Sequence, residues 1–348
     1  MRKIIFVILI VILTVSICMM ASCKKEEEPD NSWKENVSYD LSIPTLDDEN
    51  WYLVFEDDFE GTQLNENIKF GENYNGNREI WTYSPHAIRW KSDDNKKPGQ
   101  ACYWCDEMVE IKDSNLIVHS RYEDNHTCDG DCPKEGRFTG GIETRKIVGD
   151  NNNNKGTSDE MLFSQAFGYF ECKAKFPNSK GLWSAFWLQS SNMRRVGNEG
   201  EDGTEIDVFE SAFINQKQSQ MGHCLLWDGY GKSAKSLPYI TKLNQDLYDG
   251  YHTYALKWTP EYYVFYIDGE PTWATDAGNV SKVKEFLRFT VEIDAGDGWG
   301  PHGQKIGKFN DSEPQDDFMV DYIKVYQNKE YENFIKSDDE FTGSFDLD

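Results

Sequence analysis

Glu205-Ile206-Asp207-Val208-Phe209-Glu210 places three carboxylates within a single stretch of six residues. The intervening Ile, Val and Phe favour a β-strand, in which successive side chains point to opposite faces of a sheet. On a regular strand Glu205 and Asp207 share one face, whereas Glu210 points to the other. A one-residue β-bulge between Asp207 and Glu210 would bring all three acids together, because an extra residue shifts every later side chain by one position. The stretch therefore predicts a bulged strand that presents a row of acids.

Such a row suits the chemistry of glycoside hydrolysis. The retaining reaction uses two carboxyl groups, one as an ionised nucleophile and one as a proton donor to the leaving oxygen. A neighbouring negative charge raises the pKa of the donor and helps it to keep its proton. The alternative interpretation is a solvated acidic strand edge, since the chain contains 61 Asp and Glu residues.

The wider sequence resembles glycoside hydrolase family 16, in particular its bulged branch of laminarinase-like endo-β-1,3-glucanases, agarases, porphyranases and endo-β-galactosidases. The resemblance extends from residue 51 to residue 327. It rests on LVFEDDFEGT at 53–62, NREIWTY at 77–83, FGYFE at 167–171, GLWSAFWL at 181–188, YHTYALKW at 251–258, IDG at 267–269 and VDYIKVY at 320–326.

This resemblance implies an all-β fold, a β-jelly-roll sandwich of two antiparallel sheets with a concave substrate cleft. Short alternating segments bounded by Gly, Asn, Asp and Pro favour the same class. The implied activity is that of an endo-acting retaining β-glycosidase. Glu205 would be the nucleophile, Asp207 its electrostatic helper, and Glu210 the general acid and base.

The expected substrate is β-1,3-glucan of the laminarin type. Three departures from a standard laminarinase lie at VFES (208–211), WDGYG (227–231) and TVEI (290–293). They keep open an endo-β-galactosidase that acts on poly-lactosamine of host O-glycans and keratan, or on algal galactan. An alternative of another class is a non-catalytic surface glycan-binding lipoprotein, although such a protein would keep aromatic residues and lose the acids. A structural adhesion sandwich would explain neither the acids nor the Trp pair.

Two tryptophans, Trp183 and Trp187, lie four positions apart on one expected strand and therefore share a face. By resemblance Trp183 stacks against a sugar next to the cleaved bond, whereas Trp187 could serve either the substrate or the core. Asn77 would reach a glycan hydroxyl by resemblance, with turn formation as the alternative.

Further substrate-binding candidates follow the acidic strand. His223 matches by position a histidine that laminarinases carry on the neighbouring strand. Trp227 and Tyr230 belong to a loop expected to display both rings toward the substrate.

The N-terminus predicts a targeting segment. Arg2 and Lys3 precede mostly apolar residues 4–17, which are too few for a membrane span, and Ala-Ser-Cys follows at 21–23. We expect a lipoprotein signal peptide at 1–22, a lipidated flexible linker at 23–45 that begins with Cys23, a hydrolase domain at 46–330 and an acidic C-terminal tail at 331–348. An uncleaved anchor is the alternative. KKEEE at 24–28 favours an extracytoplasmic bacterial lipoprotein that is displayed on the cell surface.

Charge and composition restrict the partners. The net charge of −25 disfavours nucleic acid and anionic membrane surfaces, so the membrane is reached only through the lipid. An aromatic content of 14% with 11 Trp fits a polysaccharide partner, because sugar rings stack on aromatic faces. We expect a monomer.

The cysteines leave two possibilities open. Cys102-x-x-Cys105 and Cys128-x-x-x-Cys132 fit either disulfides, the default outside the cytoplasm, or a four-thiolate zinc site. Cys172 and Cys224 fit buried thiols. Catalysis is expected to need no cofactor. The resemblance allows a structural calcium with Asp321 as a ligand, and a surface salt bridge would explain Asp321 equally well.

Overall fold

The computed structural model describes residues 30–85, 87–88, 102–128, 132–147, 159–210, 219–293, 306–312 and 314–346. Asn31–Asp348 forms one compact unit, to which the following description applies. The expected signal peptide and the lipidation site at Cys23 lie outside the described residues. In the described part of the chain, no helix has the length and apolar composition that crossing a membrane requires.

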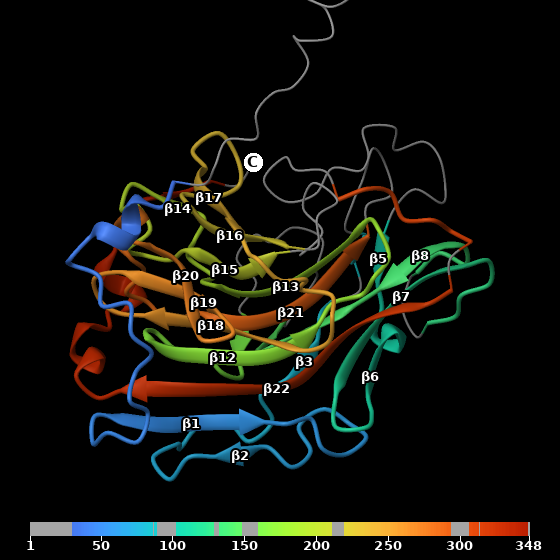
Figure 1. The fold of residues 1–348 in the computed structure, drawn as a ribbon, viewed down its shortest axis with the longest axis horizontal. Helices are drawn as coiled ribbons and strands as arrows, with labels where there is room; N and C mark the ends of the chain where they lie inside the picture. Colours follow the sequence, from blue (N-terminus) through green and yellow to red (C-terminus); the bar gives the residue numbers. More distant parts are fainter. Residues whose placement is uncertain are drawn as a thin grey trace, which may run out of the picture. The chain divides into compact units, whose positions relative to one another are not determined.

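Most of the described strands belong to two large sheets (Figure 1). The first sheet has the order β20-β19-β18-β12-β22-β7-β8-β5-β4, and β1, β2 and β6 pair off this path. The second has the order β17-β16-β15-β13-β21-β9-β3, and the short pairs β10–β11 and β14–β23 stand apart. The strands are β1 (Trp51–Asp57), β2 (Lys69–Phe70), β3 (Thr82–Tyr83), β4 (Ala87–Ile88), β5 (Cys102–Trp104), β6 (Val109–Ile111), β7 (Leu116–Glu123), β8 (Gly136–Thr139), β9 (Gly141–Glu143), β10 (Arg145–Lys146), β11 (Glu160–Met161), β12 (Gly168–Lys175), β13 (Leu182–Gln189), β14 (Arg195–Val196), β15 (Glu205–Glu210), β16 (Gln220–Trp227), β17 (Lys235–Lys242), β18 (His252–Trp258), β19 (Tyr263–Ile267), β20 (Glu270–Thr275), β21 (Phe286–Ile293), β22 (Asp316–Asn328) and β23 (Ser344–Phe345). Short 3-10 helices are η1 (Ser32–Glu35), η2 (Asp106–Met108), η4 (Ala277–Asn279), η6 (Tyr331–Phe334) and η7 (Asp338–Glu340).

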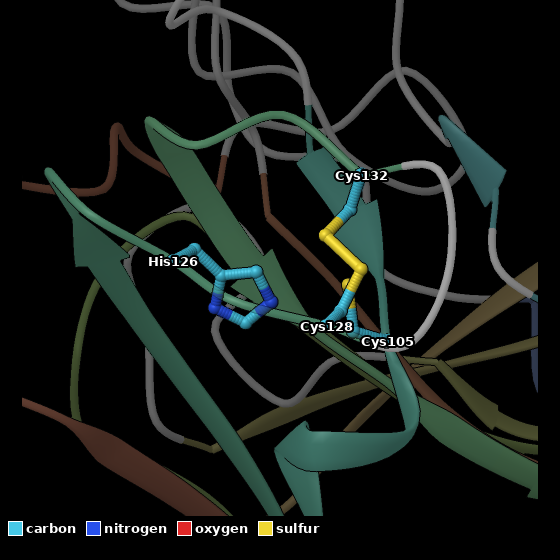
Figure 2. A group of neighbouring side chains, drawn as sticks. All are labelled: Cys105, His126, Cys128 and Cys132. Carbon is cyan, nitrogen blue, oxygen red and sulfur yellow. A yellow bond between two sulfur atoms is a disulfide. The ribbon is translucent and has the colours of Figure 1, made fainter.

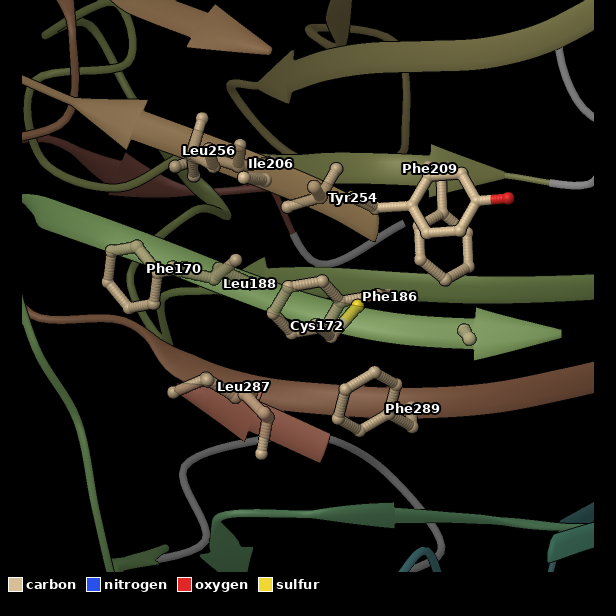
Figure 3. Packing of buried hydrophobic residues seen from close by; sticks show 14 of the residues in the cluster. Phe170, Cys172, Phe186, Leu188, Ile206, Phe209, Tyr254, Leu256, Leu287 and Phe289 are labelled. Carbon is tan, nitrogen blue, oxygen red and sulfur yellow. The ribbon is translucent and has the colours of Figure 1, made fainter. Parts of the chain in front are cut away.

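The core lies between the two large sheets (Figure 3). Alternation along each strand sends one set of side chains inward, as in β21, where Leu287 and Phe289 are buried. The rings of Phe186 and Phe289 stack with their centroids 4.6 Å apart. Facing them across the core are β12 and β18, which contribute Phe170, Cys172, Tyr254 and Leu256. This packing confirms the predicted all-β sandwich and buries the Cys172 thiol as expected.

The predicted bulge is present on β15. Against β13, Glu205 pairs with Gln189 and Asp207 with Trp187, whereas Glu210 pairs with Ala185 after a shift of register. The same shift separates Asp207 from Glu210 in the pairing with β16. As a result Ile206 and Phe209, three positions apart, both enter the core, and the three acids share the opposite face.

The segments flanking the sheets are ordered where they are described. Within the expected linker, Trp33 is buried in the core, and the Lys257 ammonium donates to the Ser42 carbonyl at 2.7 Å. Trp33, together with Tyr39 and Leu41, thus docks a segment whose charged composition predicts a flexible tether. Within the expected tail, Ser344–Phe345 forms β23, which pairs with β14.

Candidate active site

The second sheet carries all three acids on the face that points away from the core, which we call the acid face. One row of this face crosses five strands in register, with Glu143, Arg288, Trp187, Asp207 and Cys224 side by side. In Figure 1, β15 lies between β13 and β16 in this sheet. The acids are therefore held on a central strand, where pairing on both sides restricts their movement.

Glu205 is held by two donors. The Gln189 amide donates to Glu205 Oε2 at 2.9 Å, and the Tyr230 hydroxyl donates to the same oxygen. Burial and the Glu205 carboxylate raise the pKa of Tyr230 well above its ordinary value, so the hydroxyl keeps its proton and remains a donor. Both bonds stabilise the negative charge on Glu205, which suits a nucleophile. Tyr230 has 43% of its surface exposed, so the predicted loop residue does reach the acids.

Glu210 accepts a hydrogen bond from the indole nitrogen of Trp183 at 3.1 Å. The half-buried Trp183 thus touches one of the acids directly, a contact that the stacking role expected for it did not include. An oxygen of Asp207, an oxygen of Glu210 and the sulfur of Cys224 all lie within 4.8 Å of one another. Cys224 is buried, as expected, and it lines the acid row from β16.

Asp207 is the buried middle member of the row. Burial and the neighbouring carboxylates of Glu210 and Glu205 raise its pKa well above the ordinary value. A raised pKa favours the protonated form of Asp207, which lessens the repulsion in a row where three negative charges would lie side by side. A protonated Asp can donate a hydrogen bond, the role that the sequence suggests for a helper of the nucleophile.

Trp187 is packed on the acid face. Its indole nitrogen donates to Thr290 Oγ1 at 3.0 Å, and the Arg288 guanidinium lies 4.0 Å from its ring centroid. Arg288 in turn pairs with Glu143 at 2.9 Å. Between the two roles left open for Trp187, these contacts favour the packing role.

The structure places His223 in the core, which corrects its expected position beside the sugar. On β16 the side chain of Cys224 points to the acid face, so that of the adjacent His223 points to the opposite face. Only 1% of His223 is exposed. Its Nδ1 lies 2.7 Å from the carbonyl oxygen of Val208, and its Nε2 lies 3.1 Å from Thr272 Oγ1. Val208 is the extra residue of the bulge, whose carbonyl is displaced from the regular ladder. His223 donates to that carbonyl and thereby holds the bulge.

Trp227 is turned away from the acid row, and Asn77 makes the contacts of a turn. Trp227 shares the inward parity of His223, belongs to the core cluster and is 8% exposed, so it is not displayed toward a substrate. Asn77 is exposed in the irregular segment before β3, because the strand expected at 77–83 is limited to Thr82–Tyr83. The Tyr74 hydroxyl donates to the Asn77 carbonyl at 2.8 Å, as the turn alternative suggests.

Three residues of the site are additional to the sequence predictions. Gln189 and Arg288 could have been found by extending the alternation of β13 and β21, since both follow the parity of the acid face. Glu285 could not, because it lies outside the named strands and directly follows a charged stretch with Lys282 and Lys284. Its Oε1 accepts the backbone N–H of Thr204 at 3.0 Å, which fixes the residue immediately before Glu205. Burial raises the pKa of Glu285 to about 8.

Asp321 engages a cation from the protein itself. Its Oδ2 lies 2.6 Å from the Lys173 ammonium, which matches the salt-bridge alternative for this residue.

A family model described as glycosyl hydrolases family 16 matches residues 124–324, more than half of the chain. The chain belongs to glycosyl hydrolase family 16. An endo-1,3-1,4-beta-glycanase of Rhizobium meliloti is 26% identical over 164 residues, which cover 47% of this chain and 31% of that protein. The chain thus spans about a third of the length of this relative. A keratan-sulfate endo-1,4-beta-galactosidase of Sphingobacterium multivorum is 26% identical over 176 residues, 47% of this chain and 38% of that protein.

Solved structures share the fold of this chain. A laminarinase catalytic domain from Thermotoga petrophila has a TM-score of 0.55 at 18% identity and covers 81% of this chain and 100% of that one. A structure from work on endo-acting O-glycanases of the human gut microbiota has a TM-score of 0.56 at 19% identity, with coverage of 85% and 96%. Family 16 hydrolases need no cofactor for catalysis.

His223→Leu tests the role of the bulge. Loss of the donor to the Val208 carbonyl should let the bulge relax and displace Glu210, so we expect kcat to fall by about 10- to 100-fold with KM nearly unchanged. Thr272→Val is the matched control, because it removes only the partner of the other ring nitrogen. Steady-state kinetics on a cleaved glycan measure both constants, and a folded His223→Leu enzyme with normal kcat would contradict the role.

Glu285→Gln tests the proton held below the acid row. The folded pKa of about 8 lies above the ordinary value of 4.5, so folded protein binds a proton that the unfolded chain has lost at neutral pH. The wild-type free energy of unfolding should therefore fall as pH rises from 4.5 to 8 and then level off. Gln still accepts the Thr204 N–H but cannot ionise, so the advantage of the variant should grow across this window. Urea unfolding at several pH values measures it, and a pH-independent difference would refute the assignment.

Proposed function

We propose that the chain is an endo-acting, retaining β-glycosidase that cleaves internal β-linkages of a polysaccharide. The observation that carries this proposal is the bulged strand β15, which turns Glu205, Asp207 and Glu210 to one face. Membership of family 16 and the donors around each acid support it.

In the first step Glu205 attacks the anomeric carbon while the bond to the leaving oxygen breaks. Glu210 gives that oxygen its proton, and the sugar becomes bonded to Glu205. In the second step Glu210 takes a proton from water, and the resulting hydroxide displaces the Glu205 carboxylate from the sugar. Two displacements restore the original configuration, as retention requires.

The contacts of each acid fit these roles. Tyr230 and Gln189 both donate to Oε2 of Glu205. These bonds favour the anionic form of Glu205 before it attacks the sugar and after the sugar is released. Glu210 accepts a hydrogen bond from the indole nitrogen of Trp183, and the carboxyl group of Asp207 lies close enough to influence its charge. Asp207 can donate to Glu205 as the nucleophile regains its charge, which stabilises the leaving carboxylate in the second step.

We propose a β-1,3-glucan of the laminarin type as the substrate. Support comes from the bulged strand and from the fold of the Thermotoga petrophila laminarinase domain. A second candidate is an endo-β-galactosidase acting on O-glycan or keratan poly-lactosamine, or on algal galactan. The keratan-sulfate endo-1,4-beta-galactosidase relative and the O-glycanase fold match favour this second candidate.

A substrate panel with matched variants tests the proposal. Purified protein is incubated with laminarin, mixed-linkage glucan, keratan, mucin glycans, agarose and porphyran, and products are sized by mass spectrometry. We expect oligosaccharides from one glycan class, with β-configured reducing ends in early NMR spectra because the mechanism retains configuration. Glu205→Gln and Glu210→Gln should lower turnover by at least about 1000-fold and keep glycan binding, since each removes one of the two reacting groups.

The control variant is Glu292→Gln, which changes a half-buried acid outside the row, on β21, which β13 separates from β15. Normal hydrolysis by either Gln variant of the row, or release of monosaccharide alone, would refute the proposed mechanism or the endo action.

We also propose that the chain is a monomeric extracytoplasmic lipoprotein, held at the membrane only through a lipid on Cys23 and displayed on the cell surface. The apolar segment before Ala-Ser-Cys at 21–23 supports the anchor, and the charged residues after it support display. Cys23→Ser should shift the protein from the membrane fraction to the soluble fraction of its host. Unchanged fractionation would refute the lipid anchor. If added protease left the protein intact on whole cells, surface display would be refuted. A mass above that of one chain in light scattering would refute the monomer.

A further inference from the structure

Four potential metal ligands converge at one end of the first sheet. Cys105 directly follows β5, His126 and Cys128 follow β7, and Cys132 precedes β8. β8 pairs with both β5 and β7, so the pairing brings the three strand ends together. The three sulfurs and a ring nitrogen of His126 all lie within 4.8 Å of one another. Figure 2 shows the imidazole turned toward the sulfur atoms.

His126 supplies the second, independent observation. The residue is 4% exposed, and its Nε2 is buried without a hydrogen-bond partner among the described residues. Its Nδ1 lies 2.7 Å from Glu123 Oε2, so the carboxylate accepts the Nδ1–H and leaves the lone pair on Nε2. A buried nitrogen without a partner is costly, whereas a metal ion would use that lone pair. A carboxylate behind the histidine is also the usual arrangement at metal sites, because it orients the ring and raises its basicity.

We propose that Cys105, His126, Cys128 and Cys132 bind a zinc ion. Three thiolates and one imidazole are a typical donor set of structural zinc sites. With Zn–S bonds of about 2.3 Å, a tetrahedral site separates its ligand atoms by about 3.8 Å, so the four side chains need only small movements. This site lies outside the acid row and is independent of the proposed hydrolysis.

The structure joins Cys128 to Cys132 by a disulfide, and this bond and zinc compete for the same two sulfurs. Opening the disulfide takes two electrons and two protons from a dithiol, which is itself oxidised to a disulfide. Zinc binding then releases three thiol protons, one from each cysteine. The disulfide closes a loop of only a few residues and leaves the thiol of Cys105 and His126 Nε2 unused. Zinc would use all four groups and tie the loop to β5.

Such a tie matters because the local apolar core is small. Besides Cys105, the cluster beneath the site contains only Met108 and Phe138 as its buried members. A core of this size contributes little stability, so a metal ion that binds only the folded form would supply much of it. Trp104, next to Cys105, donates to the Val291 carbonyl on β21 at 2.7 Å and packs against Arg288 of the acid face. The proposed zinc would therefore fix the end of β5, whose Trp104 contacts β21 of the second sheet.

The ligand set differs from the four-thiolate site that the spacing alone suggests. Cys102 is the first residue of β5, and its sulfur accepts the backbone N–H of Ile293 at 3.3 Å in the main core. His126 takes its place. The difference gives a sharp test, because the two ligand sets predict opposite results for Cys102 and His126.

The test measures zinc bound to the full chain. The protein is produced with added zinc, purified with a dithiol present, freed of loose metal by gel filtration and analysed by mass spectrometry for metal. We expect about one zinc per chain in the wild type and in the control Cys102→Ala, and almost none in Cys105→Ser and His126→Gln. Cys172→Ala, at a buried thiol in the main core, controls for general loss of a cysteine and should keep the zinc.

Zinc-edge X-ray absorption on the wild type keeps the test valid if a variant does not fold. Three sulfurs and one nitrogen around the zinc would support the site. Wild type without zinc and with an intact Cys128–Cys132 cross-link after reduction and zinc loading would overturn it. Four sulfurs, or zinc retained in His126→Gln and lost in Cys102→Ala, would equally overturn the ligand set.

Discussion

The structure depends on one conflict of parity in strand β15. Ile206 and Phe209 must enter the core, whereas the three acids must leave from the other face, and a regular strand cannot satisfy both. The extra residue Val208 resolves the conflict. Its displaced carbonyl receives a hydrogen bond from His223 within the core. The sandwich is therefore the support of the acids: without the packing of Phe209 and His223 there would be no fixed acid row.

Placing three acids side by side is the second constraint. Tyr230 and Gln189 donate to Glu205, and Trp183 donates to Glu210, whereas burial and the neighbouring carboxylates raise the pKa of Asp207 in the middle. The environment therefore differs from one acid to the next, although all three belong to the same chemical class. The row is tolerable in the resting protein and can pass a single proton in both steps of the proposed reaction.

Local pattern was enough to predict the strand, its bulge, the sandwich and the acids, because alternation is a short-range property of the chain. The prediction was wrong for His223 and Trp227, because both side chains leave β16 on the side that faces the core. Which side chains of β16 face the core depends on the register of this strand against the bulged strand β15. A short stretch of sequence does not contain that register. His126 was missed for the same reason: the pairing of β7 and β8 around β5 brings it to the cysteines. Trp33 shows the converse, because a few apolar residues in a charged segment dock it on the core.

The last described residues complete the wall around the nucleophile. Asp346 packs against Gly229 and Gly231 so closely that a side chain at either glycine would collide with it, and its backbone N–H donates to the Arg194 carbonyl at 2.8 Å. Tyr230, which lies between those glycines, is thus braced by a segment made long after the acids themselves. During synthesis from the N-terminus, the chain carries its three acids well before their surroundings exist. The contacts around Tyr230 can therefore form only after the segment that contains Asp346 has been made and has docked.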